Sequence, residues 1–172
     1  MAAAYTLRPA SAADAAVLRA VYASTRAEEL AATGWDAAQC RAFCDMQYDA
    51  QQAHYTRHWP SARCQLVLVP DATLGTRVAG RLWVDRRADA LHVLDIALLP
   101  ATRGQGLGSA CLHDLMAEAT AAGLPLVISV ETHNPARRLY DRLGFTPDGP
   151  VQGLYQRMAW HPARACQPEH QE

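Results

Sequence analysis

The stretch PATRGQGLGSACLHDLM, residues 100–116, joins a glycine-rich turn to the beginning of a helix. It follows an almost wholly apolar run over residues 90–99, which is typical of a central strand buried on both faces. Gly104, Gly106 and Gly108 lie between this strand and the helix. Because the first amides of a helix have no internal partner and lie at the positive end of its dipole, such turns bind phosphate. The stretch therefore predicts a strand–loop–helix unit that holds a phosphorylated ligand.

The length and composition of the chain indicate one globular domain. The sequence has 172 residues, of which 50% are hydrophobic and 19% are charged, so a single core of ordinary size is expected. The net charge of −1 argues against a broad basic surface, and we expect no nucleic-acid partner. The protein is expected to be a monomer or a homodimer.

The sequence predicts neither export nor membrane insertion. The first residues, MAAAYTLRPA, lack the charged leader and long apolar stretch of a signal peptide. No apolar run approaches the roughly 18 residues of a membrane span. We therefore expect a cytoplasmic protein with no membrane partner.

The cysteines predict neither a disulfide framework nor a metal centre. Their number is odd, and their spacing shows no matching pairs. Cys40 and Cys44 would share one helix face, but no second pair completes a metal site. We expect buried or free thiols, as in a reducing compartment, at Cys40, Cys44, Cys64, Cys111 and Cys166.

Hydrophobic periodicity and turn residues divide the chain into strands and helices. Strands are expected over residues 5–8, 65–69, 77–85, 90–99 and 126–130, at Phe145 and over 154–160, and helices over 11–30, over 36–58, from the glycine turn to Ala122, and from Asn134 to Gly144. The last helix is expected to begin with Asn134 as its N-cap and Pro135 at its first position. The result is a mixed α/β single domain over residues 1–160, with a flexible tail over 161–172.

Three known phosphate loops compete for the glycine turn. A P-loop needs a lysine after its second glycine; none stands there, and the chain is poor in lysine. A dinucleotide fingerprint needs a third glycine where this chain has Ser109, and it lies early in a βαβ unit. The third pattern, Arg103-x-x-Gly106-x-Gly108, resembles the acyl-CoA loop of the GNAT family of N-acetyltransferases. By itself the turn is equally consistent with glycines that serve only the geometry of a tight connection.

Two further segments carry the same resemblance. ETHNPARRLYDRLGF, residues 131–145, is similar to the second signature region of the GNAT family, and LHVLDIALLP, residues 91–100, is similar to its fourth strand. The resemblance extends from Tyr5 to about Trp160. It implies an α/β GNAT-like single domain, whose mixed central sheet is splayed between strands 4 and 5 and is flanked by about four helices.

The resemblance also implies how the co-substrate, acetyl-CoA, would bind. Its pantetheine arm would lie between the splayed strands and pair with backbone groups of Ile96, Ala97 and Leu98. The pyrophosphate would lie on the helix N-terminus, where Arg103 adds charge at the rim. The expected acetyl-CoA contacts are Ile96, Ala97, Leu98, Arg103, Gly104, Gln105, Gly106, Leu107, Gly108, Ser109, Asn134 and Tyr140. Asn134 is either a true contact or chiefly an N-cap, because some family members carry the asparagine at the place of His133.

The implied activity is transfer of an acetyl group to a primary amine, by direct attack in a ternary complex and without a metal. Tyr140 stands at the family's tyrosine position, and a phenol can give its proton to the leaving thiolate. The alternative is a non-catalytic acyl-CoA-binding or regulatory module on the same fold.

The general base has several candidates. His92 lies on the fourth strand and titrates near neutrality, which suits a base. Asp95 stands at the opposite parity of that strand, so a regular strand would turn it to the other face unless a bulge intervenes. Glu131 and ordered water are the remaining alternatives. We take Tyr140 and His92 as the predicted catalytic residues.

The acceptor is expected to bind between Trp35 and Pro60. The polar and aromatic side chains there recur at helical spacing, at Met46, Gln47, Tyr48, Gln51, Gln52 and Tyr55. Either the glutamines line a pocket, or this face is solvated and Met46 and Tyr48 belong to the core.

Charged and aromatic residues in the same region offer contacts for an amine. Asp36, Asp45 and Asp49 could attract a cationic amine, and Trp35 and Trp59 could stack on it. The acceptor could be a small-molecule amine, an amino acid, an antibiotic, a protein N-terminus or a lysine. The near-neutral charge of the chain argues against very basic substrates.

Overall fold

The computed structural model describes residues 4–163. Most of the predicted tail, and Cys166 with it, lies outside the described residues. In chain order the elements are β1 (Thr6–Pro9), η1 (Ala12–Asp14), α1 (Ala15–Ala31), α2 (Ala37–His58), β2 (Arg63–Asp71), β3 (Gly75–Arg86), β4 (Leu91–Leu98), η2 (Pro100–Thr102), α3 (Leu107–Ala122), β5 (Leu126–Glu131), α4 (Arg137–Arg142), β6 (Thr146–Pro147) and β7 (Tyr155–Trp160), where η marks a short 3-10 turn. The predicted order of strands and helices is confirmed.

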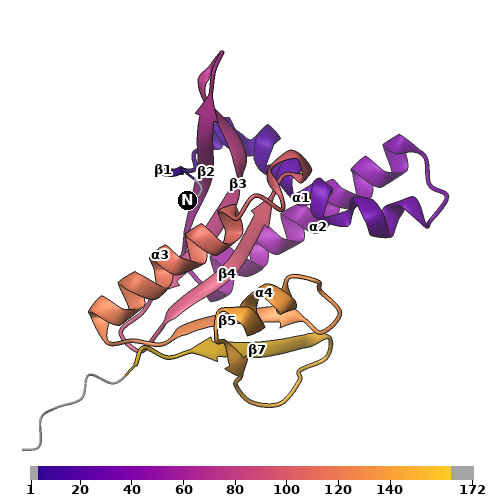
Figure 1. Ribbon diagram of the computed structural model, residues 1–172. Coiled ribbons are helices and arrows are strands. Elements are labelled where there is room, and N and C mark those ends of the chain that lie inside the picture. Colours follow the sequence, from indigo (N-terminus) through magenta and orange to yellow (C-terminus); the bar gives the residue numbers. More distant parts are fainter. Residues whose placement is uncertain (1–3, 164–172) are drawn as a thin grey trace, which may run out of the picture.

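The strands form one mixed sheet in the order β1-β2-β3-β4-β5-β7-β6. All neighbours are antiparallel except β4 and β5, which run parallel. Adjacent residues of β2 point to opposite faces: Leu66 packs with α1 and α2, and Val67 packs with α3 and α4. The helices therefore cover the sheet in two layers (Figure 1), as expected for an α/β domain.

The parallel pair of strands separates after three residue pairs. Leu91, His92 and Val93 of β4 pair with residues 126–128 of β5, and the pairing ends there. Beyond this point β4 and β5 diverge like the arms of a V (Figure 1). The predicted opening between the fourth and fifth strands is confirmed.

A β-bulge lies at the point where the pairing ends. Trp83 of β3 faces Asp95 and Val84 faces Val93, so Leu94 is an extra residue on β4. The extra residue resets the alternation, and Asp95 comes to share a face with His92. Strand parity alone predicts the opposite faces, and the bulge is the physical reason why that expectation fails.

A second local feature brings β3 close to β4 beside the opening. A Cβ atom on Gly80 would lie 2.1 Å from the backbone oxygen of Ala97, a distance that no side chain can occupy. Glycine is therefore required at this position by crowding, since its φ angle is not positive. Sequence reasoning did not identify Gly80.

The last helix begins later than predicted. Regular helix starts at Arg137 with Ala136 as its N-cap, and not at Pro135. The side chain of Asn134 accepts a hydrogen bond from the amide of Ala136 at 2.9 Å, so the segment before the helix forms a local turn. The helix ends as expected before Gly144, whose φ is +89°.

Among the residues that the structure describes, no helix is both long and apolar enough to cross a membrane.

Candidate active site

The opening between β4 and β5 holds a cavity of about 210 Å³. β4 contributes residues 94–97 to its wall, and β5 contributes residues 128–131. The cavity is lined from both faces of the sheet, because Tyr140 belongs to the core on the α3 side and Tyr22 to the core on the α1–α2 side. Residues from both faces of the sheet therefore meet in the wall of this cavity.

Tyr140 lies in the cavity wall and is 4% exposed. Its ring packs edge-on against Phe145, with the ring centroids 5.8 Å apart. Burial, together with the negative charge of Asp95, raises the pKa of the Tyr140 hydroxyl above its usual value. The phenol is therefore protonated at neutral pH and can donate a hydrogen bond.

A buried ion pair lies in the same wall. Arg81 is 1% exposed, and its Nε donates to Oδ2 of Asp95 at 2.6 Å. Nη2 of Arg81 donates to Oε1 of Gln51 on α2 at 2.7 Å, and the guanidinium lies 5.7 Å from the ring centroids of Tyr22 and Tyr48. Desolvation raises the pKa of Asp95, while the charge and hydrogen bond of Arg81 oppose that rise. The cluster ties both N-terminal helices to β3 and β4 beside the opening.

Sequence reasoning missed Arg81. The available signal was an arginine within the apolar run VAGRLWV, residues 78–84, because an arginine is almost never fully buried unless it is paired. Its partner could not be named from the sequence, since the bulge at Leu94 decides which side chain of β4 faces it.

A larger chamber of about 630 Å³ adjoins the cavity, between α2 and the sheet. Both spaces share Gln51, Tyr55 and Tyr155 among their lining residues, so they are neighbours, and we call the two together the cleft. The rings that line the larger space are Tyr22, His54, Tyr55, Trp59, His92 and Tyr155. We call this space the aromatic chamber.

His92 lines the aromatic chamber and is absent from the described lining of the cavity that holds Tyr140. The side chain is nearly buried, and its ring lies 5.0 Å from that of Trp59. Burial lowers the pKa of His92 below its usual value. The imidazole is therefore neutral at neutral pH and can accept a proton. Asp95, in contrast, lines the same cavity as Tyr140.

Glu131 and Asn134 also line the cavity, from its more exposed side. Oε1 of Glu131 accepts a hydrogen bond from the Tyr155 hydroxyl at 3.2 Å and lies 3.9 Å from Nη1 of Arg26. Of the two positions considered for the asparagine contact, Asn134 lines the cavity and His133 does not.

The glycine turn presents a row of free amides. Gly104 and Gly106 adopt positive φ angles of 71° and 78°, which glycine permits without strain. Among the described residues, no backbone amide from Gly104 to Ser109 donates to a protein acceptor. Gly108 has an ordinary φ, and a Cβ there would lie 3.6 Å from Leu139 of α4. Its glycine is therefore not required by the geometry of the protein alone.

The Arg103 side chain points back into the protein. Its Nε donates to the carbonyl oxygen of Leu98 at 2.8 Å, and its Nη2 lies 3.2 Å from both the carbonyl oxygen and the hydroxyl of Ser24 on α1. The arginine thus ties the loop to the end of β4 and to α1. Nε and Nη2 are engaged in this way, and the expected role of the Arg103 charge at the loop rim stays a prediction.

The backbone of β4 offers hydrogen-bonding groups to the opening. The amide of Leu99 donates to Ala79 on β3, and antiparallel strands alternate the side to which these groups point. Backbone groups of Ile96 and Leu98 therefore face the opening, whereas those of Ala97 face β3. The Leu98 carbonyl is taken by Arg103, which leaves its amide free.

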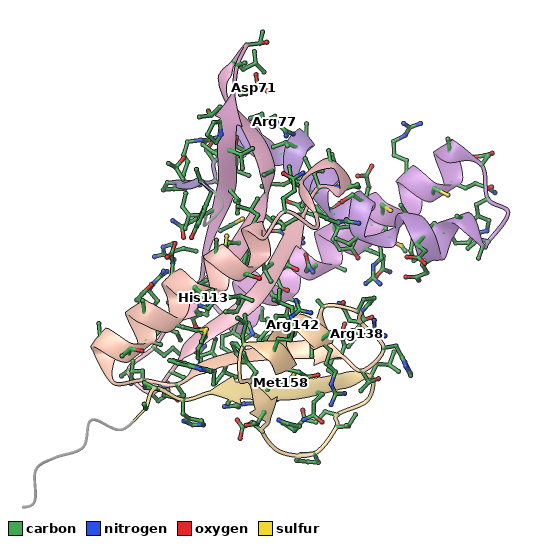
Figure 2. The ribbon with its side chains drawn as sticks, viewed as in Figure 1. Asp71, Arg77, His113, Arg138, Arg142 and Met158 are labelled. Carbon is green, nitrogen blue, oxygen red and sulfur yellow. The ribbon has the colours of Figure 1, made fainter. Side chains whose placement is uncertain are left out.

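Arginines of α4 add positive charge on the side of the sheet where α3 runs. Figure 2 shows Arg138 and Arg142 on α4, well away from Asp71 and Arg77 at the tip of the β2–β3 hairpin. Leu139 of α4 packs against the same core as α3, so α4 lies on the α3 side of the sheet.

The α2 residues expected at the acceptor site divide between several roles. Tyr48 is buried in the core, and Met46 is 57% exposed, so the expectation that both belong to the core holds for Tyr48 alone. Gln47, Gln51 and Tyr55 line the aromatic chamber, so the pocket interpretation is correct for them.

The acidic residues expected to attract an amine are engaged elsewhere. Asp36 caps α2, where it accepts a hydrogen bond from the amide of Gln39 at 2.8 Å. Asp45 and Asp49 bind Arg19, at 3.2 and 2.6 Å. Of the two tryptophans, Trp59 lines the chamber, and Trp35 packs on Phe43 with ring centroids 5.4 Å apart, away from the cleft.

The described cysteines carry free thiols. Within residues 4–163, no three histidine, cysteine, aspartate or glutamate side chains gather in a way that could hold a metal ion. His54 and His58 lie with ring centroids 4.5 Å apart on α2.

These features are those of an acyl-CoA-dependent acyltransferase fold, and comparison with known proteins identifies the family. A family model described as the acetyltransferase (GNAT) family matches residues 27–145, which is well over half of the chain. The protein therefore belongs to the GNAT family. Membership supports acetyl transfer as its class of reaction.

Solved structures of acetyltransferases share the fold. A PaiA N-acetyltransferase from Thermoplasma acidophilum, in complex with coenzyme A, superposes with a TM-score of 0.68 at 13% identity, over 92% of this chain and 99% of that chain. An acetyltransferase from Thermus thermophilus gives a TM-score of 0.60 at 21% identity, over 94% and 99% of the two chains. At these identities the likeness concerns the fold.

Replacing Arg81 by methionine should lower the free energy of unfolding by about 3 kcal/mol at about pH 8, because a buried carboxylate loses its partner. A carboxyl whose pKa is higher in the folded than in the unfolded state gains folding stability as the pH falls. The loss should therefore shrink as the pH falls and Asp95 takes up a proton. Urea denaturation at a series of pH values measures both effects.

Two controls accompany this measurement. Arg86 lies on the same strand as Arg81 and forms an exposed pair with Glu118 of α3. Arg86→Met breaks this pair and should lower the free energy of unfolding much less. Adding Asp95→Asn to Arg81→Met should abolish the pH dependence of the loss. A loss that is the same at all pH values in Arg81→Met would contradict the assignment.

Proposed function

We propose that the protein is an acetyl-CoA-dependent N-acetyltransferase that transfers an acetyl group to a primary amine by direct attack in a ternary complex. The observation that carries the proposal is the cavity in the opened sheet, which Tyr140 lines on one side and the acceptor-side cleft joins on the other. Because residues from both faces of the sheet line this cavity, donor and acceptor would approach each other from opposite faces.

The donor would bind on the α3 side. The free amides from Gly104 to Ser109 offer donors to its pyrophosphate, with Gln105 and Leu107 contributing backbone only. Backbone groups of Ile96 and Leu98 would pair with the pantetheine arm, while Ala97 forms part of the cavity wall. Asn134 in the cavity wall and the arginines of α4 would contact the remainder of the acetyl-CoA molecule.

The chemistry asks three things of the protein. The neutral amine attacks the thioester carbonyl carbon, and the free amide of Leu98 is the proposed donor to the oxyanion that forms. As the carbon–sulfur bond breaks, Tyr140 donates its hydroxyl proton toward the thiolate. Its raised pKa keeps this proton on the phenol at neutral pH, so the hydroxyl is available to donate to the thiolate as that charge forms.

A base must take the proton that the amine loses. We keep His92 as the proposed base, acting through water, because it lines the acceptor side of the cleft and is neutral at neutral pH. Asp95 is the alternative, since it lines the cavity itself. The short ion pair with Arg81 argues against it, because taking up a proton would cost the carboxylate its charged partner.

The Gly106→Ala variant tests donor binding. An alanine at φ +78° strains the loop and puts a methyl group beside the free amides, so we expect the affinity for coenzyme A to fall by at least about tenfold. Titration calorimetry with coenzyme A gives the affinity. Gly75→Ala is the matched control, because Gly75 has φ +74° in the β2–β3 hairpin: it should lose similar stability and bind normally. Equal affinity in the two variants would refute the loop assignment.

The Tyr140→Phe variant tests the proton donor. It should bind acetyl-CoA as the parent does, but release thiol from acetyl-CoA at least about tenfold more slowly with a saturating amine. Tyr5→Phe, which removes a hydroxyl bonded to Asp114 away from the cleft, should leave turnover unchanged. Full turnover in Tyr140→Phe would exclude this role for Tyr140. If the unmodified protein binds acetyl-CoA but releases no thiol with any amine, the result would instead support a non-catalytic acyl-CoA-binding module.

The pH dependence of the rate tests the base. With His92 as base, kcat/KM should rise with pH through a pKa below the usual histidine value, since burial lowers it. The charged groups around it, Asp85, Asp89, Arg87 and Arg157, oppose one another. His92→Ala should abolish this acidic limb, and Asp95→Asn should preserve it. The reverse pattern would make Asp95 the base.

A further inference from the structure

We infer that the acceptor is a small aromatic amine that carries a single primary amino group and no carboxylate, with its ring in the aromatic chamber. This inference rests on the proposed function, because it names the acceptor of that same reaction. It follows from what lines the two parts of the cleft.

The two parts of the cleft differ in charge. The cavity of about 210 Å³ contains the carboxylates of Asp95 and Glu131 together with the guanidinium groups of Arg26 and Arg81. The described lining of the chamber, about 630 Å³ in volume, contains no carboxylate, and Arg26 is the one guanidinium or ammonium group in it. Carboxylates thus line only the end near Tyr140, where each lies beside an arginine, and the body of an acceptor whose amine reacts there meets a space without an anionic site.

The cation of the chamber is already neutralised. Nη1 of Arg26 lies 3.1 Å from Oε2 of Glu29 and 3.9 Å from Oε1 of Glu131, and its Nε donates to the Tyr22 hydroxyl at 3.4 Å. A carboxylate on the acceptor would have to displace these partners to gain a cation. Free amino acids are for this reason poor candidates.

The rings of the chamber are held in place by contacts of their own. The Tyr55 hydroxyl donates to the Leu94 carbonyl at 3.0 Å, and its ring lies 4.7 Å from that of Trp83. The guanidinium of Arg87 lies 4.3 Å from the Trp59 ring centroid. Side chains fixed in this way lose little entropy when a ligand binds, and such rings pack well against a flat aromatic body.

The Tyr55 hydrogen bond also links the two parts of the cleft. Leu94 is the bulged residue at which β4 leaves β5, so the same contact positions the chamber wall and the edge of the opening. A ring lodged against Tyr55 and Trp59 would direct a short amino-bearing chain toward the cavity that Asp95 and Tyr140 line.

A substrate panel tests the inference with acetyl-CoA as donor and thiol release as the readout. Tryptamine and 2-phenylethylamine should have kcat/KM values at least about tenfold above those of tryptophan, which adds a carboxylate, spermidine, which adds charges, and hexylamine, which lacks a ring. If tryptophan, spermidine or hexylamine equals or exceeds tryptamine, the inference is overturned while the acetyltransferase function stands.

The Trp59→Leu variant tests the place of the ring. It should raise KM for tryptamine by about tenfold and leave KM for acetyl-CoA and for hexylamine nearly unchanged. Trp35→Leu is the matched control, because Trp35 packs on Phe43 outside the cleft, and it should change neither value. Equal effects of the two substitutions would overturn the assignment of the chamber.

Binding separates this inference from the proposed function. Tryptamine should raise the melting temperature of the coenzyme A complex, and hexylamine at the same concentration should not. If tryptamine binds but no amine supports thiol release, the chamber assignment stands and the proposed function fails. If tryptamine neither binds nor reacts, the inference fails.

Discussion

The opening of the sheet depends on one bulged residue, Leu94 in β4. The last pair between β4 and β5 is Val93 with Ile128, and the extra residue follows immediately. A carbonyl group that leaves a sheet needs another partner, and the Tyr55 hydroxyl supplies it from α2 at 3.0 Å. The helix that covers the sheet thus stabilises the very interruption that creates the cavity.

The same bulge determines the electrostatics of the site. By resetting the alternation it turns Asp95 toward Arg81, and the pair forms a hydrogen-bonded cluster with Gln51. A buried ion pair often stabilises a fold no more than apolar packing of the same volume would. We therefore take the role of this cluster to be the positioning of charged groups at the cavity. It holds charge at the cavity wall, and the carboxylate of Asp95 adds to the rise in the pKa of Tyr140 that burial causes.

In the proposed function, the donor and the acceptor would bind on opposite faces of the sheet. The free amides of the glycine turn and the arginines of α4 lie with α3. The aromatic chamber lies under α2 on the other face. Tyr140 and Asp95 line the cavity where the two meet. This arrangement explains why the donor side carries a readable motif while the acceptor side does not: backbone amides need glycines at set positions, but a chamber can be lined by many combinations of side chains.

Local patterns in the sequence determined the order of the elements and the glycine turn before α3, because each depends on residues close together in the chain. The prediction for Tyr140 came from the resemblance to the GNAT family. The late start of α4 was missed, since Asn134 satisfies a local turn as well as a cap. The tertiary structure alone decided which face of the sheet Asp95 takes and that it pairs with Arg81. It also decided that Asp36 caps α2 and that Asp45 and Asp49 bind Arg19. These outcomes depend on strand register and on contacts between distant segments, and a shift of one residue at Leu94 is enough to reverse which side chains meet in the cavity.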